Sequence, residues 1–388
     1  SNLFGVNDLG VFLGSSSSER PFLSSSGTGF TPSSNVRKFD AAWSRFGTVG
    51  SAIPFANSVS EQSGGPIGLL DCGEGGTLLS DWLNTSGPQW TALKDAITAV
   101  GGKIAFAYIA IGSNDAATSA VTSRQAHEAN LRQLIANLRD FTGQPTLRVV
   151  LIGMNRRTNH TIDSGVYAQQ ANYVRMAETA LGDDLTANVL YVPTHDLLMN
   201  VSDGTHLTSS AAGFPAAATR AAYIAGKVMY GDGAYPRGPR FSSAVYSGAD
   251  ITFTLQHRNG NDFALPTAPG LTVTDNSGAA TAVSVTKLNA LSFRVTYDRI
   301  LVNPKSPYLA GGAPAVNTMI LDSGGAVSLP VPVDTELTPT QAEGDASAPT
   351  LPGPLSVTNI TQTSATLSWP QGSDDIGVAG YEYRMNPS

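Results

Sequence analysis

Asp203 and His206 form the pair of residues with the clearest chemical potential in this chain. The carboxylate lies three residues ahead of the imidazole, and Gly204 between them allows a tight turn. Such a turn can point both side chains the same way, so that Asp203 orients His206 as a general base. A helix pattern over 209–230 follows directly, which gives Asp203 a competing structural role as the cap of that helix.

Two glycine turns upstream could complete a site of this kind. The first contains Gly112 and Asn114, whose side-chain amide could donate a hydrogen bond to an oxyanion formed during acyl transfer. The second contains Gly75 and Gly76, where the missing side chain lets a backbone N–H approach the same oxyanion closely. Together with the carboxylate–imidazole pair, these turns indicate ester chemistry by an activated hydroxyl.

The elements that must position these residues alternate between apolar runs and helix patterns. Helical spacing of apolar residues predicts helices over 90–100, 122–141, 167–181 and 209–230. Short apolar runs between and before them predict strands at 10–13, 66–70, 104–111, 147–152 and 188–192. Strands separated by helices favour an α/β fold with a parallel sheet covered on both faces. In such a sheet the ligand lies at the carboxyl ends of the strands, where the two glycine turns fall.

Several short segments resemble one known family in both sequence and order. They lie at 35–40, 54–56, 65–70, 75–82, 111–116 and 203–208. In this order they resemble the SGNH (GDSL-like) hydrolases, and most closely the branch of sialate O-acetylesterases and related carbohydrate acetylesterases. The resemblance covers about residues 1–230. It implies a three-layer α/β/α domain with a five-stranded parallel sheet and no cofactor.

The same resemblance assigns roles to individual residues. It implies a serine nucleophile, His206 as the base, Asp203 as its partner, and Gly76 with Asn114 in the oxyanion hole. The nucleophile block departs from the family's usual Gly-Asp-Ser or Gly-Gln-Ser-Asn, and two serines compete for the role. Ser16 follows the first predicted strand, whereas Ser1 begins a Ser-Asn-x-x-Gly run that matches the block's text. The sequence match favours Ser1. With Ser1 as the nucleophile, however, the strand that precedes it would lie outside this chain, and a central strand is costly to remove from a parallel sheet. Both serines therefore stay candidates, with Ser16 slightly ahead.

Other histidines offer weaker alternatives. His195 precedes Asp196 at the end of the fifth predicted strand and is a rival base. His127 lies in a helix pattern, and we expect it to face solvent. Histidine spacing offers no convergent ligand set, and the single Cys72 excludes an internal disulfide or a cysteine cage, so we expect no metal.

Composition limits the remaining classes. The chain has 388 residues, a net charge of −7 and only 14% charged residues, which excludes a broad basic surface for nucleic acid. No apolar run reaches the ~18–20 residues that span a bilayer, so we expect no membrane insertion. Low charge with many Gly, Ser and Thr residues is typical of an extracellular protein, whether secreted, cell-surface or virion-associated.

The pattern changes after residue 230. A turn-rich linker at 231–239 precedes short runs that predict strands at 250–255, 271–274, 282–285, 293–297 and 326–329. They indicate a small antiparallel β-sandwich over 240–334, which a Pro- and Thr-rich linker at 335–349 follows. Residues 350–388, with Trp369 and the Gly380-Tyr-Glu-Tyr-Arg384 run, resemble the first half of a fibronectin type III domain.

Two functions fit this organisation. The first is a serine esterase that removes O-acetyl groups from a glycan or polysaccharide by a Ser-His-Asp acyl-enzyme mechanism. The alternative is a catalytically impaired glycan-binding module of a surface or phage tail fibre, because the nucleophile block departs from the family pattern. In both cases an acetylated glycan is the expected partner, and the chain is expected in a larger fibre or surface assembly.

Overall fold

The computed structural model describes ten stretches of the chain. They are residues 9–13, 52–63, 68–73, 76–99, 101–156, 166–200, 202, 206–308, 319–342 and 353–370. Ser1, Ser16 and Asp203, which the sequence analysis singled out, lie outside the described residues.

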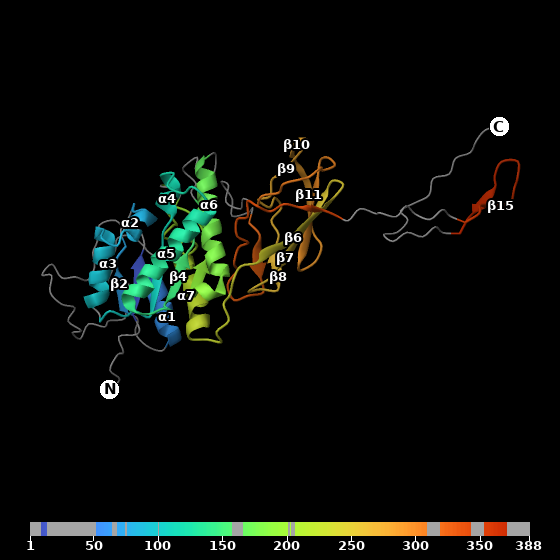
Figure 1. Ribbon diagram of the computed structural model, residues 1–388. Helices are drawn as coiled ribbons and strands as arrows, with labels where there is room; N and C mark the ends of the chain where they lie inside the picture. Colours follow the sequence, from blue (N-terminus) through green and yellow to red (C-terminus); the bar gives the residue numbers. More distant parts are fainter. Residues whose placement is uncertain are drawn as a thin grey trace.

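A parallel sheet forms the centre of the N-terminal part (Figure 1). In sheet order its strands are β2 (Gly68–Asp71), β1 (Leu9–Leu13), β3 (Phe106–Ala110), β4 (Arg148–Ile152) and β5 (Val189–Val192). Every pairing between neighbours is parallel, and each strand overlaps one of the five predicted apolar runs. The predicted α/β class is confirmed. Because β1 lies between β2 and β3, the turns after β2 and β3 flank the carboxyl end of β1.

Helices cover both faces of this sheet (Figure 1). They are α1 (Ala52–Ser63), α2 (Leu79–Leu83), α3 (Pro88–Ala99), α4 (Ser113–Ala117), α5 (Arg124–Thr142), α6 (Val166–Asp183) and α7 (Phe214–Met229), with a 3-10 turn at Leu185–Ala187. Successive residues of a strand point to opposite faces. Val149 of β4 accordingly packs in the core under α3 and α5, and Val150 packs in the core under α1 and α7. None of the described helices is long and apolar enough to cross a membrane.

Local signals explain where α5 begins and ends. The hydroxyl of Ser123 accepts the backbone N–H of Ala126 at 3.1 Å and caps the helix, so α5 begins two residues later than the apolar spacing predicts. Gly143 ends the helix with a φ of 62°, a left-handed conformation that glycine adopts at little cost. The cap residues therefore decide the ends, and the apolar periodicity decides only the body of the helix.

A second sheet organises the C-terminal part (Figure 1). Its strands, in order, are β11 (Ala282–Lys287), β12 (Ser292–Tyr297), β7 (Asp250–Gln256), β6 (Arg240–Ser247) and β14 (Thr340–Gln341). Shorter pairs are β9 (Val273–Asp275) with β10 (Gly278–Ala280), β8 (Asp262–Ala264) with β13 (Leu321–Ser323), and β15 (Ser356–Thr358) with β16 (Thr366–Ser368). In β7 the alternate residues Ile251, Phe253 and Leu255 are buried, as a strand with one core face requires.

Two expectations for this part were wrong in detail. Residues 326–329 were expected to form a strand, but the strand is β13 and these residues belong to the return of a hairpin. Backbone bonds from Asp322 to Leu329 and from Val331 to Ile320 close this hairpin, and the Asp322 carboxylate adds a bond by accepting the backbone N–H of Leu329. Residues 335–349 were expected to be a linker, but they contain β14, which joins the large sheet by pairing with β6 in parallel.

A buried ion pair links the two parts. Arg220 of α7 forms two hydrogen bonds of 2.7 Å each to the carboxylate of Asp196, which lies beyond β5. It also donates to the backbone carbonyl of Ser328 at 3.0 Å, across the boundary between the parts. Burial alone would raise the pKa of Asp196, but the charge and hydrogen bonds of Arg220 outweigh it and hold that pKa below its ordinary value.

Replacing Arg220 with Met should destabilise the protein, because the Asp196 carboxylate would stay buried without its cationic partner. Breaking a buried pair from one side typically costs about 3–5 kcal/mol of unfolding free energy. Urea denaturation of both proteins at pH 7 measures the difference.

Lys227→Met is the matched control, since Lys227 lies on the same helix and its pair with Asp232 is exposed. We expect this control to unfold near the wild-type midpoint. Equal midpoints for Arg220→Met and the control would contradict the structural role of the buried pair.

Candidate active site

The turns after β2 and β3 both depend on glycine. Gly76 has a φ of 77° and Gly112 a φ of 107°, values that residues with a side chain rarely adopt. Gly112 precedes α4, so the turn passes directly into a short helix that carries Asn114. These two turns stand on either side of the carboxyl end of β1, where the family pattern expects a nucleophile.

A hydrogen bond joins the two turns directly. The side-chain amide of Asn114 donates to the backbone carbonyl of Gly76 at 2.6 Å. An asparagine amide has two N–H groups, so one bond to Gly76 leaves the second to donate to a ligand. The structure thus brings together the two residues to which the resemblance assigns the oxyanion hole.

Asp115 makes a second connection between the same segments. Its side chain is buried, and both carboxylate oxygens accept the backbone N–H of Leu79, at 3.0 and 3.2 Å. Leu79 is the first residue of α2, whose N–H has no partner within its own helix. Burial is the largest influence on this carboxyl and raises its pKa, although the Leu79 bond opposes the shift. Sequence motifs pointed to Asn114 and missed this neighbour.

His127 packs next to the Gly112 turn. The expectation that it faces solvent was wrong. Its side chain is only 3% exposed, and burial lowers its pKa to about 4, so it is neutral at pH 7. A Cβ placed on Gly112 would lie 2.7 Å from Val174 and 3.3 Å from the His127 Nε2. His127 shares three- and four-residue spacing with the buried Leu131, Leu134 and Leu138, which is the sequence signal for its burial.

His206 lies in a hairpin between β5 and α7. Its backbone carbonyl accepts the N–H of Asn200 at 2.8 Å, and Leu207 forms an antiparallel bridge with Met199. Thr208 then accepts the N–H of Phe214, the first residue of α7, at 2.9 Å. The imidazole is exposed on the connection that leaves the carboxyl end of β5, the same edge that carries the two glycine turns.

His195 occupies a different environment from His206. It is buried, and its Nε2 lies 3.2 Å from the backbone carbonyl of Val331 in the C-terminal part. Burial lowers its pKa to about 4. This environment favours a structural role at the boundary over that of the rival base.

A buried carboxyl holds the residues just beyond β4. Glu178 of α6 is inaccessible to solvent and accepts the backbone N–H of Met154 at 2.8 Å. Burial raises its pKa to about 8, against the opposing effects of that bond and of the Arg175 charge. Within the described residues, no group of three or more histidine, cysteine or acidic side chains could hold a metal ion.

Comparison with known proteins identifies the family. The family model for carbohydrate esterases described as sialic acid-specific acetylesterases matches residues 17–220, which is more than half of the chain. The chain therefore belongs to this family of carbohydrate esterases, a class of carboxylic ester hydrolases.

Solved structures and a curated protein show more limited similarity. A carbohydrate acetylesterase from Xanthomonas citri is 13% identical with a TM-score of 0.52; the match covers 73% of this chain and 64% of that one, and it shows the shared fold. An acetylxylan esterase from Geobacillus stearothermophilus is 15% identical with a TM-score of 0.36, over 58% of this chain and 95% of that one. Chitinase A1 from Niallia circulans is 41% identical over 61 residues, which are 16% of this chain and 9% of the chitinase.

Asp115→Ala should destabilise the protein and release the start of α2. The change leaves the Leu79 N–H without its acceptor, and a hydrogen bond to a charged group is worth about 1.5–3 kcal/mol. Urea denaturation measures the loss, and amide hydrogen exchange at Leu79 should speed up. Asp115→Asn keeps one acceptor oxygen and should retain most of the stability. If Ala and Asn lose equal amounts, the bond to Leu79 is not what Asp115 contributes.

Glu178→Gln should remove part of the pH dependence of stability. The folded-state pKa of Glu178, about 8, lies above the ordinary value of 4.5, so folding takes up a proton between these pH values. The contribution of the neutral carboxyl is complete below pH 4.5 and is lost as the pH rises toward 8. Gln stays neutral throughout and can still accept the Met154 N–H.

The unfolding free energy of the wild type should therefore fall relative to Glu178→Gln, by up to about 1.4 kcal/mol per pH unit in this window. Parallel urea titrations from pH 5 to pH 8 measure the difference, and the titration of histidines is common to both proteins. A constant difference across this range would contradict a raised pKa at Glu178.

Proposed function

We propose that this chain is a serine esterase that removes O-acetyl groups from a carbohydrate. Membership of the carbohydrate esterase family supports the reaction class. The observation that carries the proposal is the bond between Asn114 and Gly76, because it holds two hydrogen-bond donors on either side of the end of β1. Donors fixed before the reaction stabilise a developing oxyanion without reorganisation.

The nucleophile in this proposal is Ser16. β1 ends at Leu13, three residues before Ser16, and its carboxyl end lies between the two glycine turns. Ser1 instead comes eight residues before β1 in the sequence. The direction of the strand favours Ser16 over Ser1, and both serines enter the test below.

The proposed reaction proceeds in two steps. His206, oriented by Asp203, accepts the proton of the serine hydroxyl while the oxygen attacks the acetyl carbonyl. The Gly76 N–H and the Asn114 amide bind the oxyanion, and the sugar hydroxyl leaves with a proton from His206. Water then attacks the acetyl-enzyme with the same groups in the same roles, which releases acetate.

The rest of the chain fits an accessory role in this proposal. We assign residues 1–230 to the esterase domain, 240–334 together with β14 to a β-sandwich, the rest of 335–349 to a linker and 350–388 to the start of a fibronectin type III domain. The antiparallel pairing of β15 with β16 supports the last assignment. An extracellular location in a larger fibre or surface assembly follows from the same proposal.

His206→Ala should lower kcat for hydrolysis of p-nitrophenyl acetate by about 10²–10⁴-fold, because the serine loses its general base. KM should change little, since the imidazole acts on the reacting proton. Release of acetate from acetylated xylan and from O-acetylated sialic acid, measured on the same proteins, identifies the carbohydrate.

His257→Ala is the matched control, because His257 is a histidine of the C-terminal part that bonds the backbone of Ala290. We expect wild-type rates from it. A fluorophosphonate label mapped by mass spectrometry should mark Ser16 in the wild type. Equal rates for His206→Ala and wild type would defeat the esterase proposal, and glycan binding without turnover would favour the binding-module alternative.

A further inference from the structure

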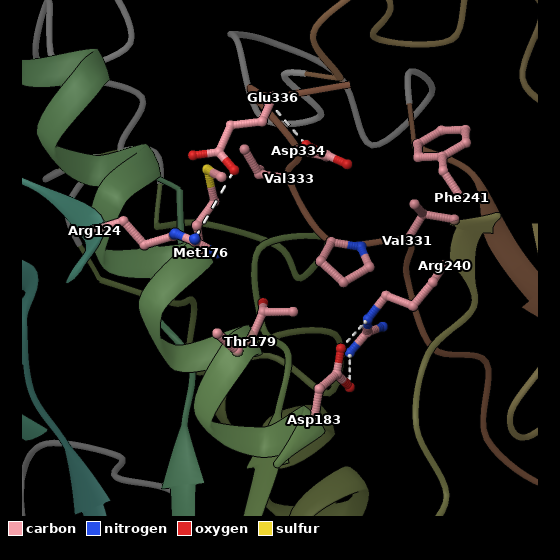
Figure 2. Close-up of a pocket in the computed structure, with 12 residues that line it drawn as sticks. Arg124, Met176, Thr179, Asp183, Arg240, Phe241, Val331, Val333, Asp334 and Glu336 are labelled. Carbon is pink, nitrogen blue, oxygen red and sulfur yellow. Dashed lines mark hydrogen bonds and ion pairs between the residues drawn. The ribbon is translucent and has the colours of Figure 1, made fainter. Parts of the chain in front are cut away.

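A cavity of about 410 Å³ lies between α6 and residues 331–336 of the C-terminal part (Figure 2). Its volume falls within the roughly 300–1,000 Å³ of typical small-molecule sites. It is separate from the turns of the candidate active site, since neither Gly76, Asn114 nor His206 lines it. Its walls come from both parts of the chain, so the site exists only where the two parts pack together.

Polar contacts fix one end of the cavity. Asp183 of α6 accepts hydrogen bonds from Arg240 at 2.9 and 3.0 Å (Figure 2). It also accepts a hydrogen bond from Arg258 at 2.7 Å. The Thr335 hydroxyl lies 3.1 Å from the sulfur of Met176, a residue of α6 that lines the cavity. These contacts tie α6 to the C-terminal part beside the cavity, so the cavity is preformed.

The other end of the cavity carries charged groups that are loosely held. The Arg124 guanidinium nitrogen and the Glu336 carboxylate oxygen lie 3.9 Å apart at this end (Figure 2). Their side chains are 29% and 61% exposed. An exposed ion pair at this distance contributes little free energy, so each group can leave the pair and bind a ligand instead. Asp334 lies beside them, and one of its carboxylate oxygens accepts the Glu336 N–H at 2.9 Å.

Apolar groups supply the rest of the lining. Val331 and Val333 are buried, and Pro332 and Met176 extend the same surface (Figure 2). A sugar ring has the same two-sided character, with an apolar C–H face and a rim of hydroxyls. Hydroxyls can donate to the two carboxylates and accept from the guanidinium. An anion would be repelled by the carboxylates, and a purely apolar ligand would leave these charges without polar partners.

One helix connects this cavity with the candidate active site. Arg124 and His127 are three residues apart on α5 and lie on the same face of the helix. The His127 ring lies so near Gly112 that a Cβ there would be 3.3 Å from its Nε2, and the Gly112 turn carries Asn114. The end of the cavity at Arg124 therefore lies about one helical turn from a residue that supports the candidate oxyanion hole.

We propose that this cavity is a second carbohydrate-binding site, which holds neutral sugar units of the polysaccharide that is deacetylated at the sheet edge. The proposal rests on the carbohydrate specificity of the proposed function and not on its catalytic chemistry. Sugar units bound here keep a long substrate on the enzyme between one acetyl group and the next.

Isothermal titration of the full chain with xylotetraose and with cellotetraose tests the site. Both probes are neutral and carry no acetyl ester, so the reaction cannot contribute to the signal. We expect saturable binding of at least one probe by the wild type. Glu336→Ala should weaken that binding by at least about tenfold, because it removes a charged hydrogen-bond acceptor. Ala180→Leu should abolish it by filling the cavity from α6.

Glu128→Ala is the matched control, because Glu128 is an ion-paired glutamate of α5 outside the cavity. It should bind the probes like the wild type. All three variants should hydrolyse p-nitrophenyl acetate at wild-type rates, since none touches the proposed machinery. Failure of the wild type to bind either probe, or unchanged binding by Ala180→Leu, would overturn the proposal. Sugar binding by a wild type that hydrolyses no ester would instead defeat only the proposed function.

Discussion

The hydrogen bond from Asn114 to the Gly76 carbonyl is the constraint on which the candidate site depends. The two residues follow strands that are not neighbours, because β1 separates β2 from β3. Their turns must therefore reach toward each other across the end of β1, and glycines with positive φ allow that path. Asp115 repeats the link one residue later through Leu79. The geometry that could stabilise an oxyanion is thus set by hydrogen bonds from the side chains of one turn to the backbone of the segment after β2.

Much of the N-terminal fold could be predicted because its signals are local. Apolar runs buried on both faces and helices with three- and four-residue spacing predict β3, β4, β5, α3, α5 and α6 to within a few residues. α7 begins five residues later than predicted, and the short α4 was not predicted. The C-terminal part was less predictable, since its short strands pair over long distances. β14 has only two residues and pairs with β6 in parallel. No local sequence pattern predicts this pairing. The Asp322 side chain supports the hairpin at 321–330 by accepting the backbone N–H of Leu329, but its residue type does not distinguish it from a loop residue in the sequence.

The site could be predicted in part for a related reason. Gly76, Asn114 and His206 belong to short motifs whose order along the chain resembles that of the family, whereas the groups that support them are defined by burial. A histidine in a helix rich in polar residues is expected to face solvent, and only its spacing with the buried leucines of α5 indicates that His127 is buried. Glu178 gives no sequence signal at all, because its position is set by the backbone of Met154 at the end of another element. Buried polar groups of this kind become visible only in three dimensions.

The boundary between the two parts is held by charged groups in a way that bears on function. Arg220 of α7 donates to the backbone of Ser328. Asp183 of α6 accepts hydrogen bonds from Arg240 of β6 and from Arg258 in the loop after β7. Such contacts depend on distance and direction, so the parts meet in one arrangement rather than as loosely tethered modules. In the proposed function, a rigid boundary fixes the distance between the candidate active site and the proposed sugar site. A flexible linker would let that distance vary.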